Sequence, residues 1–301
     1  MPTALPPPAM PFDRVAILDW SASATPSPAR PSANAIWIGT DFGEIADSYH
    51  RTRADAEARL HTLVANALSN GRRLLIGADF PFGYPQGFAR ALTGRPGALA
   101  LWDWLAAHVT DGPDNANTRF ALADRINARF PGIGPFWGRP AHLALPCLPD
   151  RGSLRHGHPF PERRVVEGMV RSAQPCWKLY TTGSVGSQAL MGIPAMHRLR
   201  AAFAGNVAVW PFEPWQSANV VLAEVYPSLL SKEVAAVMAK EAGPQIKDRV
   251  QVRLLAGALA SLAHTGQLAP LFAPDAAPAV LTEEGWILGI GHEAALRRAA
   301  A

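Results

Sequence analysis

Short apolar runs alternate with longer helical patterns along the chain. Residues 15–21 and 74–79 form runs that are too short for helices and are bounded by turn-forming residues, which is typical of buried strands in a parallel sheet. Each run carries an acid at its end, Asp19 in the first and Asp79 in the second. Because ligands bind at the carboxyl ends of strands in open α/β sheets, these two acids are the first candidates for a functional site.

The remaining pattern predicts an α/β fold with a mixed sheet flanked by helices. Further strands or extended segments are expected at residues 35–39, 44–50, 178–180, 207–210, 220–226 and 285–290. Residues 41–43 predict a hairpin turn. Helical spacing of apolar residues predicts helices at 53–69, 98–109, 119–130, 190–203, 228–240 and 245–264. The order of strand, hairpin, helix and strand is that of a ribonuclease H-like sheet.

Composition places the chain among globular proteins. Of its 301 residues, 49% are hydrophobic and 17% are charged, which suffices for a substantial core. No window is apolar and long enough for a membrane span, and residues 1–11 lack the segments of a signal peptide. We expect a flexible lead-in at 1–11, a single domain at 12–301 with a helical and loop insert at about 86–172, and a cytoplasmic location.

Four acids occupy comparable points of these elements. Asp19, Asp79 and Glu224 lie at or near the ends of predicted strands, and Asp248 lies in the first turn of a late helix. Carboxylates that meet at neutral pH repel one another unless a hard divalent cation neutralises them. Since no Cys or His accompanies them, the ligand set suits Mg²⁺ or Mn²⁺ rather than Zn²⁺. Such ions activate water and stabilise the leaving oxygen in phosphodiester cleavage.

Each acid also has an interpretation without chemistry. Asp19 and Asp79 can cap the loops that follow their strands, and Glu224 can point outward from an edge strand. Asp248 is favoured in the first turn of a helix by the helix dipole alone. We favour the functional interpretation for Asp19 and Asp79 and leave both open for Glu224 and Asp248.

Four stretches carry a further signal through their content and order. They are Val-Ala-Ile-Leu-Asp-Trp-Ser at 15–21, Ile-Gly-Ala-Asp-Phe-Pro-Phe-Gly-Tyr-Pro at 76–85, Ala-Glu-Val-Tyr-Pro at 223–227 and Glu-Gly-Trp-Ile at 284–287. Together they resemble the motifs of domain-of-unknown-function family 429, which is classed as ribonuclease H-like and described as predicted nucleases. The resemblance spans residues 15–290 and implies a nuclease-like hydrolase.

Residues 130–138, 183–188 and 247–253 resemble a subfamily that carries the label molybdopterin-guanine dinucleotide synthesis protein. The chain has neither a Gly-rich nucleotidyltransferase loop after the first strand nor a Walker A motif. It also departs from many family members, which carry several acids on the late helix, because Gln251 and Arg253 follow Asp248. A site with fewer acids can hold one metal strongly and a second only with substrate, or can have lost hydrolysis and kept binding.

The expected function is Mg²⁺-dependent phosphodiester hydrolysis of a phosphate-containing substrate, a nucleic acid or a nucleotide. Asp19, Asp79 and Asp248 would ligate the metal, and Glu224 would assist or orient the water. Two alternatives stay open: a small-molecule phosphotransferase or ATP-binding protein of the same fold, and a non-catalytic nucleotide- or cofactor-binding protein linked to molybdopterin cofactor synthesis. Stoichiometric ATP binding would indicate the first, and a ligand retained on purification the second.

Seven further side chains are candidates for substrate binding, namely Ser21, Tyr84, Arg119, Trp137, Ser184, Gln188 and Gln251. The loop at 183–188 precedes a helix and can place amides around a phosphate, although a helix N-cap at Ser184 or Ser187 explains it as well. Trp137 can stack on a base or simply pack. Ser21 has no His partner at short range, so a catalytic triad is not indicated there.

The net charge of +4 and pI near 9.4 are compatible with an anionic partner. A basic, His-containing segment offers either a solvated surface or a phosphate-facing patch, and comprises Arg151, Arg155, His156, His158, Arg163 and Arg164. Cys147 and Cys176 fit no zinc spacing, and we expect two isolated buried thiols rather than a disulfide.

Overall fold

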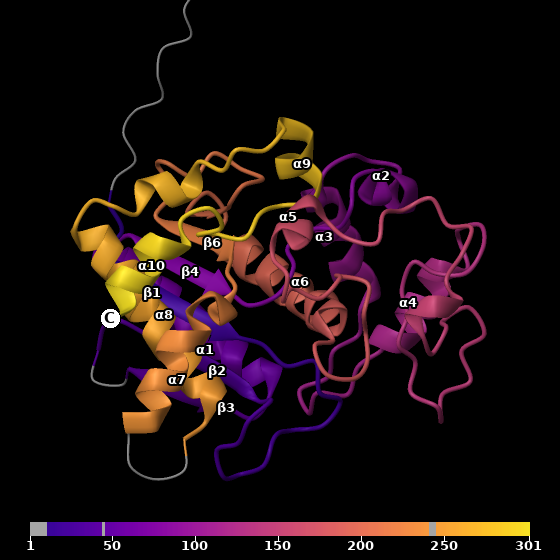
Figure 1. Cartoon of the computed structure of the whole chain (residues 1–301), viewed down its shortest axis with the longest axis horizontal. Helices are drawn as coiled ribbons and strands as arrows, with labels where there is room; N and C mark the ends of the chain where they lie inside the picture. The colour runs from indigo at the N-terminus through magenta and orange to yellow at the C-terminus, as the bar shows by residue number, and fades with distance from the viewer. Residues whose placement is uncertain (1–10, 44–45, 241–244) are drawn as a thin grey trace, which may run out of the picture.

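A six-stranded mixed sheet forms the centre of the molecule, with helices on both faces (Figure 1). The computed structural model describes residues 11–43, 46–240 and 245–301. The strands are β1 (Arg14–Asp19), β2 (Ile36–Thr40), β3 (Asp47–His50), β4 (Leu74–Ala78), β5 (Val207–Val209) and β6 (Val220–Glu224). Their order is β3-β2-β1-β4-β6-β5, in which β2 is antiparallel to both neighbours and the other pairs are parallel.

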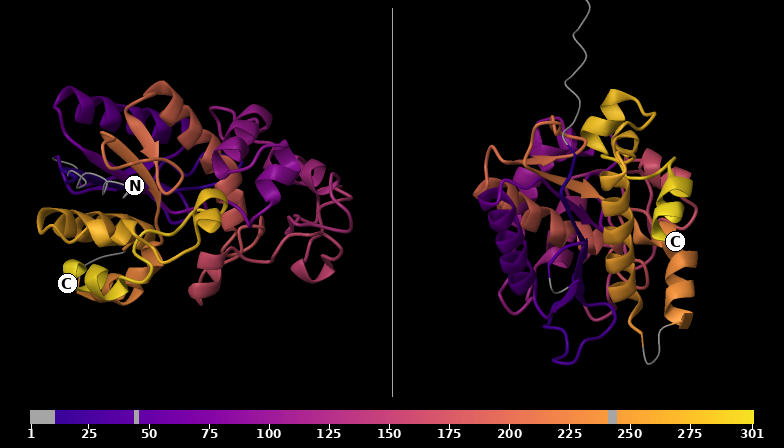
Figure 2. Two further views of the ribbon diagram at one scale, coloured as in Figure 1. Left: turned by 90° about the horizontal axis from the view of Figure 1, so that it is seen from above. Right: turned by 90° about the vertical axis from the view of Figure 1, so that its left-hand side faces the viewer.

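The helices flank the sheet in two layers and, in residues 86–172, lie beside it, as Figure 2 shows from above. They are α1 (Arg53–Ser69), α2 (Phe88–Thr93), α3 (Ala98–His108), α4 (Arg119–Asn127), α5 (Val165–Met169), α6 (Val185–Ala202), α7 (Ser231–Lys240), α8 (Lys247–His264), α9 (Pro278–Glu283) and α10 (Glu293–Ala300). Short 3₁₀ helices are η1 (Gly152–Leu154), η2 (Pro227–Leu230) and η3 (Ala269–Phe272). Helices α1 and α6 cover one face of the sheet, and α8 with α7 and α10 covers the other (Figure 2).

The alternation of side chains along the strands builds both cores. In β1, Ala16 and Leu18 pack beneath α1 and α6, whereas Val15 and Ile17 pack beneath α8. A strand that is covered on both faces has to be apolar at successive positions, which explains the continuous apolar runs in the sequence. The α/β class and the mixed sheet flanked by helices agree with the sequence prediction.

Helix α8 lies unusually close to β2 because of Gly39. A Cβ atom at this position would lie 2.5 Å from the carbonyl carbon of Val252, so any larger residue would push the helix away. This close approach holds the first turn of α8, which contains Asp248, near the sheet.

Two predicted strands are reduced to single bridges. Lys178 bridges only to Trp137, and Ile287 only to Glu224, so neither segment forms a strand, and residues 288–290 form a turn. The predicted hairpin turn is present, since the amide of Thr40 donates to the carbonyl of Ala46 at 2.7 Å. Residues 86–172 contain helices and loops without a strand. The lead-in predicted at 1–11 lies almost entirely outside the described residues.

Both cysteines are free, but only Cys176 is buried, and Cys147 is half-buried, so the expectation of two buried thiols is wrong for Cys147. In the described ranges, no helix is both long and apolar enough to cross a membrane.

Candidate active site

The backbones that carry Asp19 and Asp79 are direct neighbours. Asp19 is the last residue of β1, and Asp79 directly follows β4. Leu18 lies opposite Ala78 in the parallel register, so the two acids come next in line. The amide of Asp79 donates to the carbonyl of Leu18 at 2.9 Å. Because adjacent strands lie about 4.8 Å apart, the sheet itself brings the two predicted residues together.

Both carboxylates belong to the face of the sheet that α8 covers. Ile17 of β1 and Leu75 of β4 pack in the core beneath α8, and Asp19 and Asp79 continue the same alternation. Asp248, in the first turn of α8, is close enough for its charge to raise the pKa of both carboxyls. Three of the four predicted acids therefore gather at one edge of the sheet.

Burial and mutual repulsion oppose ionisation of this cluster. The pKa of Asp19 is raised well above its ordinary value, first by burial and then by the charges of Asp79 and Asp248. Burial, followed by Glu224 and Asp248, raises the pKa of Asp79 to about 7. Lys247 acts in the opposite direction on the pKa of both groups without cancelling the shifts. At neutral pH the surroundings of Asp19 and Asp79 therefore hold too little positive charge to stabilise both side chains as carboxylates.

This shift predicts that stability falls as pH rises. Between about pH 4 and 7 the folded state keeps a proton on Asp79 that the unfolded chain has released. The free energy of unfolding should then decrease by about 1.4 kcal/mol per pH unit from this group, and level off above its folded pKa. In urea denaturation, Asp79→Asn should be less pH-dependent over this window and more stable than the native protein at neutral pH. Asp103→Asn, at an exposed acid, should keep the native pH dependence.

The Asp79 carboxylate accepts no hydrogen bond from the residues that the structure describes, while Asp19 is near the amide of Trp20. Asp248 Oδ2 accepts a hydrogen bond from the amide of Asn34 at 2.7 Å. A partly buried carboxylate without a donor favours a proton or a cation as its partner.

A hard cation with few protein ligands fits this donor set. In the ranges that the structure describes, no three Asp, Glu, His or Cys side chains are arranged to surround an ion. Mg²⁺ does not need such a cage, because it binds through one or two carboxylates and keeps waters and substrate oxygens as its other ligands. Asp19 and Asp79 could supply those two carboxylates.

Glu224 faces the opposite side of the sheet in a buried ion pair, although its charge still reaches Asp79. Val220 and Leu222 of β6 pack on the face of α1 and α6, and Glu224 continues that alternation. Its carboxylate accepts two hydrogen bonds from Arg164, at 2.7 and 2.6 Å, and one from the amide of Phe82 at 2.9 Å. The sequence predicted that Glu224 assists or orients a water. Its hydrogen bonds instead suit it to hold the loop after Asp79.

Arg164 is the centre of a buried network that sequence reasoning missed. It is 1% exposed, and besides Glu224 it binds Glu167 Oε1 at 2.9 Å and the carbonyl of Glu284 at 2.9 Å. Glu284 in turn accepts from the amide of Val165 at 2.6 Å. The network joins the insert, β6 and the segment before the C-terminus.

Three of the predicted substrate residues lie in or contact the segments that carry Asp19 and Asp248, namely Ser21, Gln188 and Gln251. Ser21 Oγ donates to the carbonyl of Asn34, whose amide binds Asp248. Gln188 Nε2 donates to the carbonyl of Trp20 at 2.6 Å. Gln251 is buried, almost one turn beyond Asp248 on α8. All three therefore border the loop after β1 or α8.

Tyr84 and Trp137 are engaged in packing. Tyr84 is 1% exposed among aromatic rings, and its hydroxyl has no hydrogen-bond partner in the described residues. Trp137 is half-buried, and the charged groups of Arg155 and Lys178 lie 5.4 and 5.7 Å from its ring centre. Neither ring offers the open face that stacking on a base requires.

Arg119 and Ser184 do not meet around a shared anion site. Arg119 donates to Asn117 Oδ1 at 2.7 Å and to Ser187 Oγ at 3.1 Å. Ser184 holds the N-cap position of α6, but its side chain makes no capping hydrogen bond. Ser187 Oγ donates to the carbonyl of Leu179 at 2.6 Å, so neither serine acts as the predicted cap.

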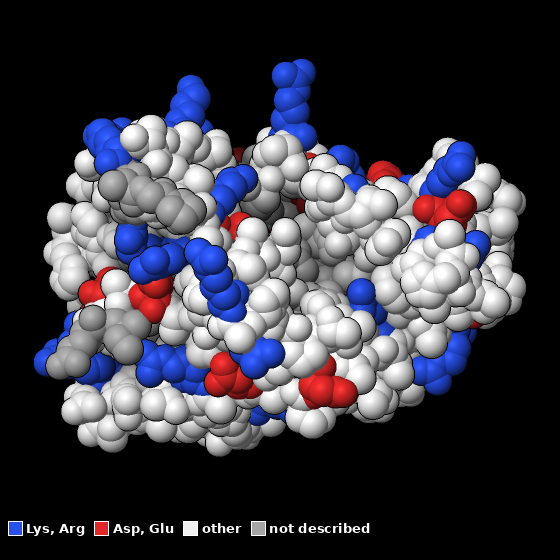
Figure 3. Space-filling view, turned by 90° about the horizontal axis from the view of Figure 1, so that it is seen from below, with Lys and Arg blue, Asp and Glu red and all other residues white. Residues whose placement is uncertain are grey.

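The basic segment at 151–164 is divided between surface and core. Arg164 is buried and Arg155 pairs with Glu162, whereas Arg151 is exposed. Basic side chains are spread over the face in Figure 3, with acidic ones among them. The phosphate-facing interpretation therefore loses two of its arginines.

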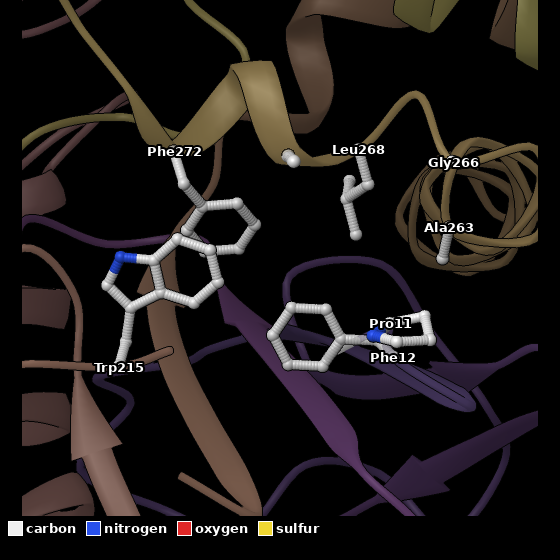
Figure 4. Close-up of a pocket in the computed structure, with 8 residues that line it drawn as sticks. Pro11, Phe12, Trp215, Ala263, Gly266, Leu268 and Phe272 are labelled. Carbon is white, nitrogen blue, oxygen red and sulfur yellow. The ribbon is translucent and has the colours of Figure 1, made fainter. Parts of the chain in front are cut away.

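An apolar cavity of about 240 Å³ lies at the opposite end of the strands, before β1 and β6. The rings of Phe12, Trp215 and Phe272 line it together with Leu268 (Figure 4). None of the described residues that line this cavity carries a titratable side chain.

A second residue missed from the sequence, Arg53, secures the loop after Asp19. It is fully buried, donates to the carbonyls of Ser21 and Ser23 at 3.1 and 2.7 Å, and forms a bidentate pair with Asp111. Its position in a helix face gave no sign of these partners.

Comparison of the chain with protein-family models, curated proteins and solved structures finds no match.

Proposed function

We propose that this chain hydrolyses phosphodiester bonds with a divalent cation, Mg²⁺ or Mn²⁺, held by Asp19 and Asp79. The observation that carries the proposal is the placement of these two carboxylates on adjacent parallel strands, on one face, with raised pKa values. A cation would remove the repulsion and stabilise both ionised groups. Carboxylate-bound divalent cations commonly serve phosphoryl chemistry.

The strand order supports a ribonuclease H-like form of this proposal. The chain runs from a strand with Asp19 through a hairpin and a helix to a parallel strand followed by Asp79, and a later helix brings Asp248. The resemblance to domain-of-unknown-function family 429 points to the same fold and to a nuclease-like activity. A nucleic acid or a nucleotide is the corresponding substrate class.

The residues around Asp19 and Asp79 would have separate roles in this reaction. When bound, the cation lowers the pKa of a coordinated water and offsets charge on the phosphate oxygens. Lys247 is exposed beside the cluster and adds a positive charge that attracts an anionic substrate. Asp248 lies near the pair, although the three carboxylates do not form a common metal cage, and it can accept a proton. Glu224 fixes the loop after Asp79 through the amide of Phe82.

Mn²⁺ titration followed by electron paramagnetic resonance tests the proposal. The native chain should bind Mn²⁺, and excess Mg²⁺ should displace it. Asp19→Asn and Asp79→Asn should each weaken binding at least about tenfold, because each removes half of the ligand charge. Asp103→Asn, whose exposed carboxylate pairs only with Arg95 and His197, should bind as the native chain does. Unchanged Mn²⁺ affinity in both site variants would refute a metal site here.

A further inference from the structure

A hydrogen-bonded chain of Ser48, His50 and Asp55 lies at the edge of the sheet, apart from the carboxylate pair. Ser48 Oγ is 2.8 Å from His50 Nε2, and His50 Nδ1 is 2.9 Å from Asp55 Oδ2. Ser48 and His50 belong to the edge strand β3, and Asp55 lies in the first turn of α1. These are the contacts that link nucleophile, base and orienting acid in serine hydrolases.

The protonation of the chain follows from its partners. An ionised Asp55 can only accept, so His50 Nδ1 must carry the hydrogen of that bond. Burial lowers the pKa of His50, with a smaller contribution from Arg59, while Asp55 acts to raise it. The imidazole is therefore neutral at pH 7, and Nε2 carries a lone pair that accepts the Ser48 hydroxyl hydrogen.

Exposure suits the three roles. His50 is 6% exposed and held by its two hydrogen bonds, Ser48 is half-buried, and Asp55 is at the surface. Ser48 and His50 pair with Ile38 and Ile36 across the strands, which places them on the face covered by α1. The base is fixed, and the nucleophile is within reach of solvent.

The edge strand also supplies a donor beside Ser48. The bond from the amide of Thr40 to the carbonyl of Ala46 sets the alternation of the β2–β3 ladder. In that alternation Ser48 and His50 bond inward to β2, and the amide of Tyr49 points outward from the sheet edge. An outward amide directly after a nucleophile can stabilise an oxyanion.

A basic cavity lies along α1, the helix that carries Asp55. It has a volume of about 580 Å³ between α1 and the β2–β3 turn, and its lining includes Arg14, Arg59, Arg72, Asn66 and Asn70. Arg59, which lines this cavity, is also close enough to His50 for its charge to lower the pKa of that imidazole. Three guanidinium groups favour a ligand with a negative charge.

We propose that Ser48 is a second reactive centre, a nucleophile activated by His50 and oriented by Asp55, which acts on carboxylic esters or thioesters that carry a negative charge. As Ser48 Oγ bonds to the carbonyl carbon, its proton moves to His50 Nε2. The bond from that carbon to the alcohol or thiol oxygen or sulfur then breaks, and the leaving group takes the proton. Water repeats the sequence on the acyl-serine, releasing the acid and restoring Ser48.

Labelling with a fluorophosphonate probe tests the nucleophile. Ser48 Oγ should displace fluoride from phosphorus, and peptide mass spectrometry should locate the adduct on Ser48. Ser48→Ala should lose the label, and His50→Gln and the exposed, isosteric Asp55→Asn should slow labelling at least about tenfold. Ser69→Ala, at an exposed hydroxyl of the same helix that contacts Asn66 and Asn70, should label as the native chain does. Thermal melts establish that each variant is folded.

Two results would overturn the proposal: no adduct on Ser48 in the native chain, or equal labelling rates in the native chain and folded Asp55→Asn. Asp79→Asn should label normally, which separates this centre from the proposed metal-dependent activity.

The substrate class is tested with the 4-nitrophenyl esters of acetate and of succinate, of which the second carries a free carboxylate. The succinate ester should react at least about tenfold faster, and Arg59→Gln should remove the difference. Equal rates in the native chain would refute the anionic preference.

Discussion

Replacing Asp79 by asparagine should reduce Mg²⁺-dependent phosphodiester cleavage by about 10³-fold or more. The substitution keeps the shape of the side chain but removes one of two charges that would hold the cation. Asp79 has no hydrogen-bond donor among the described residues, so the loss of charge breaks no protein contact. The measurement is kcat on bis(4-nitrophenyl) phosphate and on short single- and double-stranded oligonucleotides, with Mg²⁺ and Mn²⁺ in turn.

The same variant should be as stable as the native protein or more stable at neutral pH. Burial and neighbouring acids raise the pKa of Asp79 to about 7, so its ionised form opposes folding there. Loss of activity together with gained stability separates a site carboxylate from a structural one. Asp19→Asn should behave alike, and the double variant should lose little more activity than either single one, because the two residues act as a unit.

The control for Asp19→Asn and Asp79→Asn is Asp103→Asn, which alters an exposed acid that pairs with Arg95 and His197. Its cleavage rate should equal that of the native protein. Cleavage that persists in Asp19→Asn and Asp79→Asn would place the hydrolytic centre elsewhere. Native protein that binds ATP stoichiometrically but cleaves no phosphodiester would instead favour the phosphotransferase alternative.

The carboxylate pair was predictable because local pattern and sheet geometry suffice for it. Each acid follows an apolar run, and the carboxyl ends of neighbouring parallel strands coincide. Hydrophobic patterning also placed the helix at Arg53–Ser69 and the turn before β3. These features depend on residues that are close in sequence, or on the single rule that parallel strands end at the same edge of a sheet.

Partners that are distant in sequence were not predictable. Glu224 ends a strand as Asp19 does, and nothing nearby indicates that Arg164, 60 residues earlier, neutralises it. The face of β6 on which Glu224 lies depends on strand register, and a shift by one residue would reverse it. Ser48 and His50 are near in sequence, but their contact with Asp55 depends on how α1 follows the edge strand. Long polar side chains choose partners in three dimensions, which periodicity does not encode.

Replacing Arg164 by methionine should lower the free energy of unfolding by about 3–5 kcal/mol, more than any other substitution proposed for this chain. Arg164 and Glu224 are 1% and 3% exposed, and two hydrogen bonds of 2.7 and 2.6 Å join them. Methionine occupies similar volume but leaves Glu224 and Glu167 as unpaired charges in the core. The value is obtained from urea denaturation at neutral pH.

Three comparisons identify the cause of that loss. Arg198→Met removes an equally bidentate pair with Glu57, but Arg198 is 43% exposed, so about 1 kcal/mol or less should be lost. Adding Glu224→Gln to Arg164→Met should recover part of the stability, because it removes a buried charge. The Arg164→Met defect should also shrink in mild acid, since the unpaired glutamates can then take up protons. Equal losses for Arg164→Met and Arg198→Met, or no recovery in the double variant, would show that packing rather than charge compensation makes Arg164 necessary.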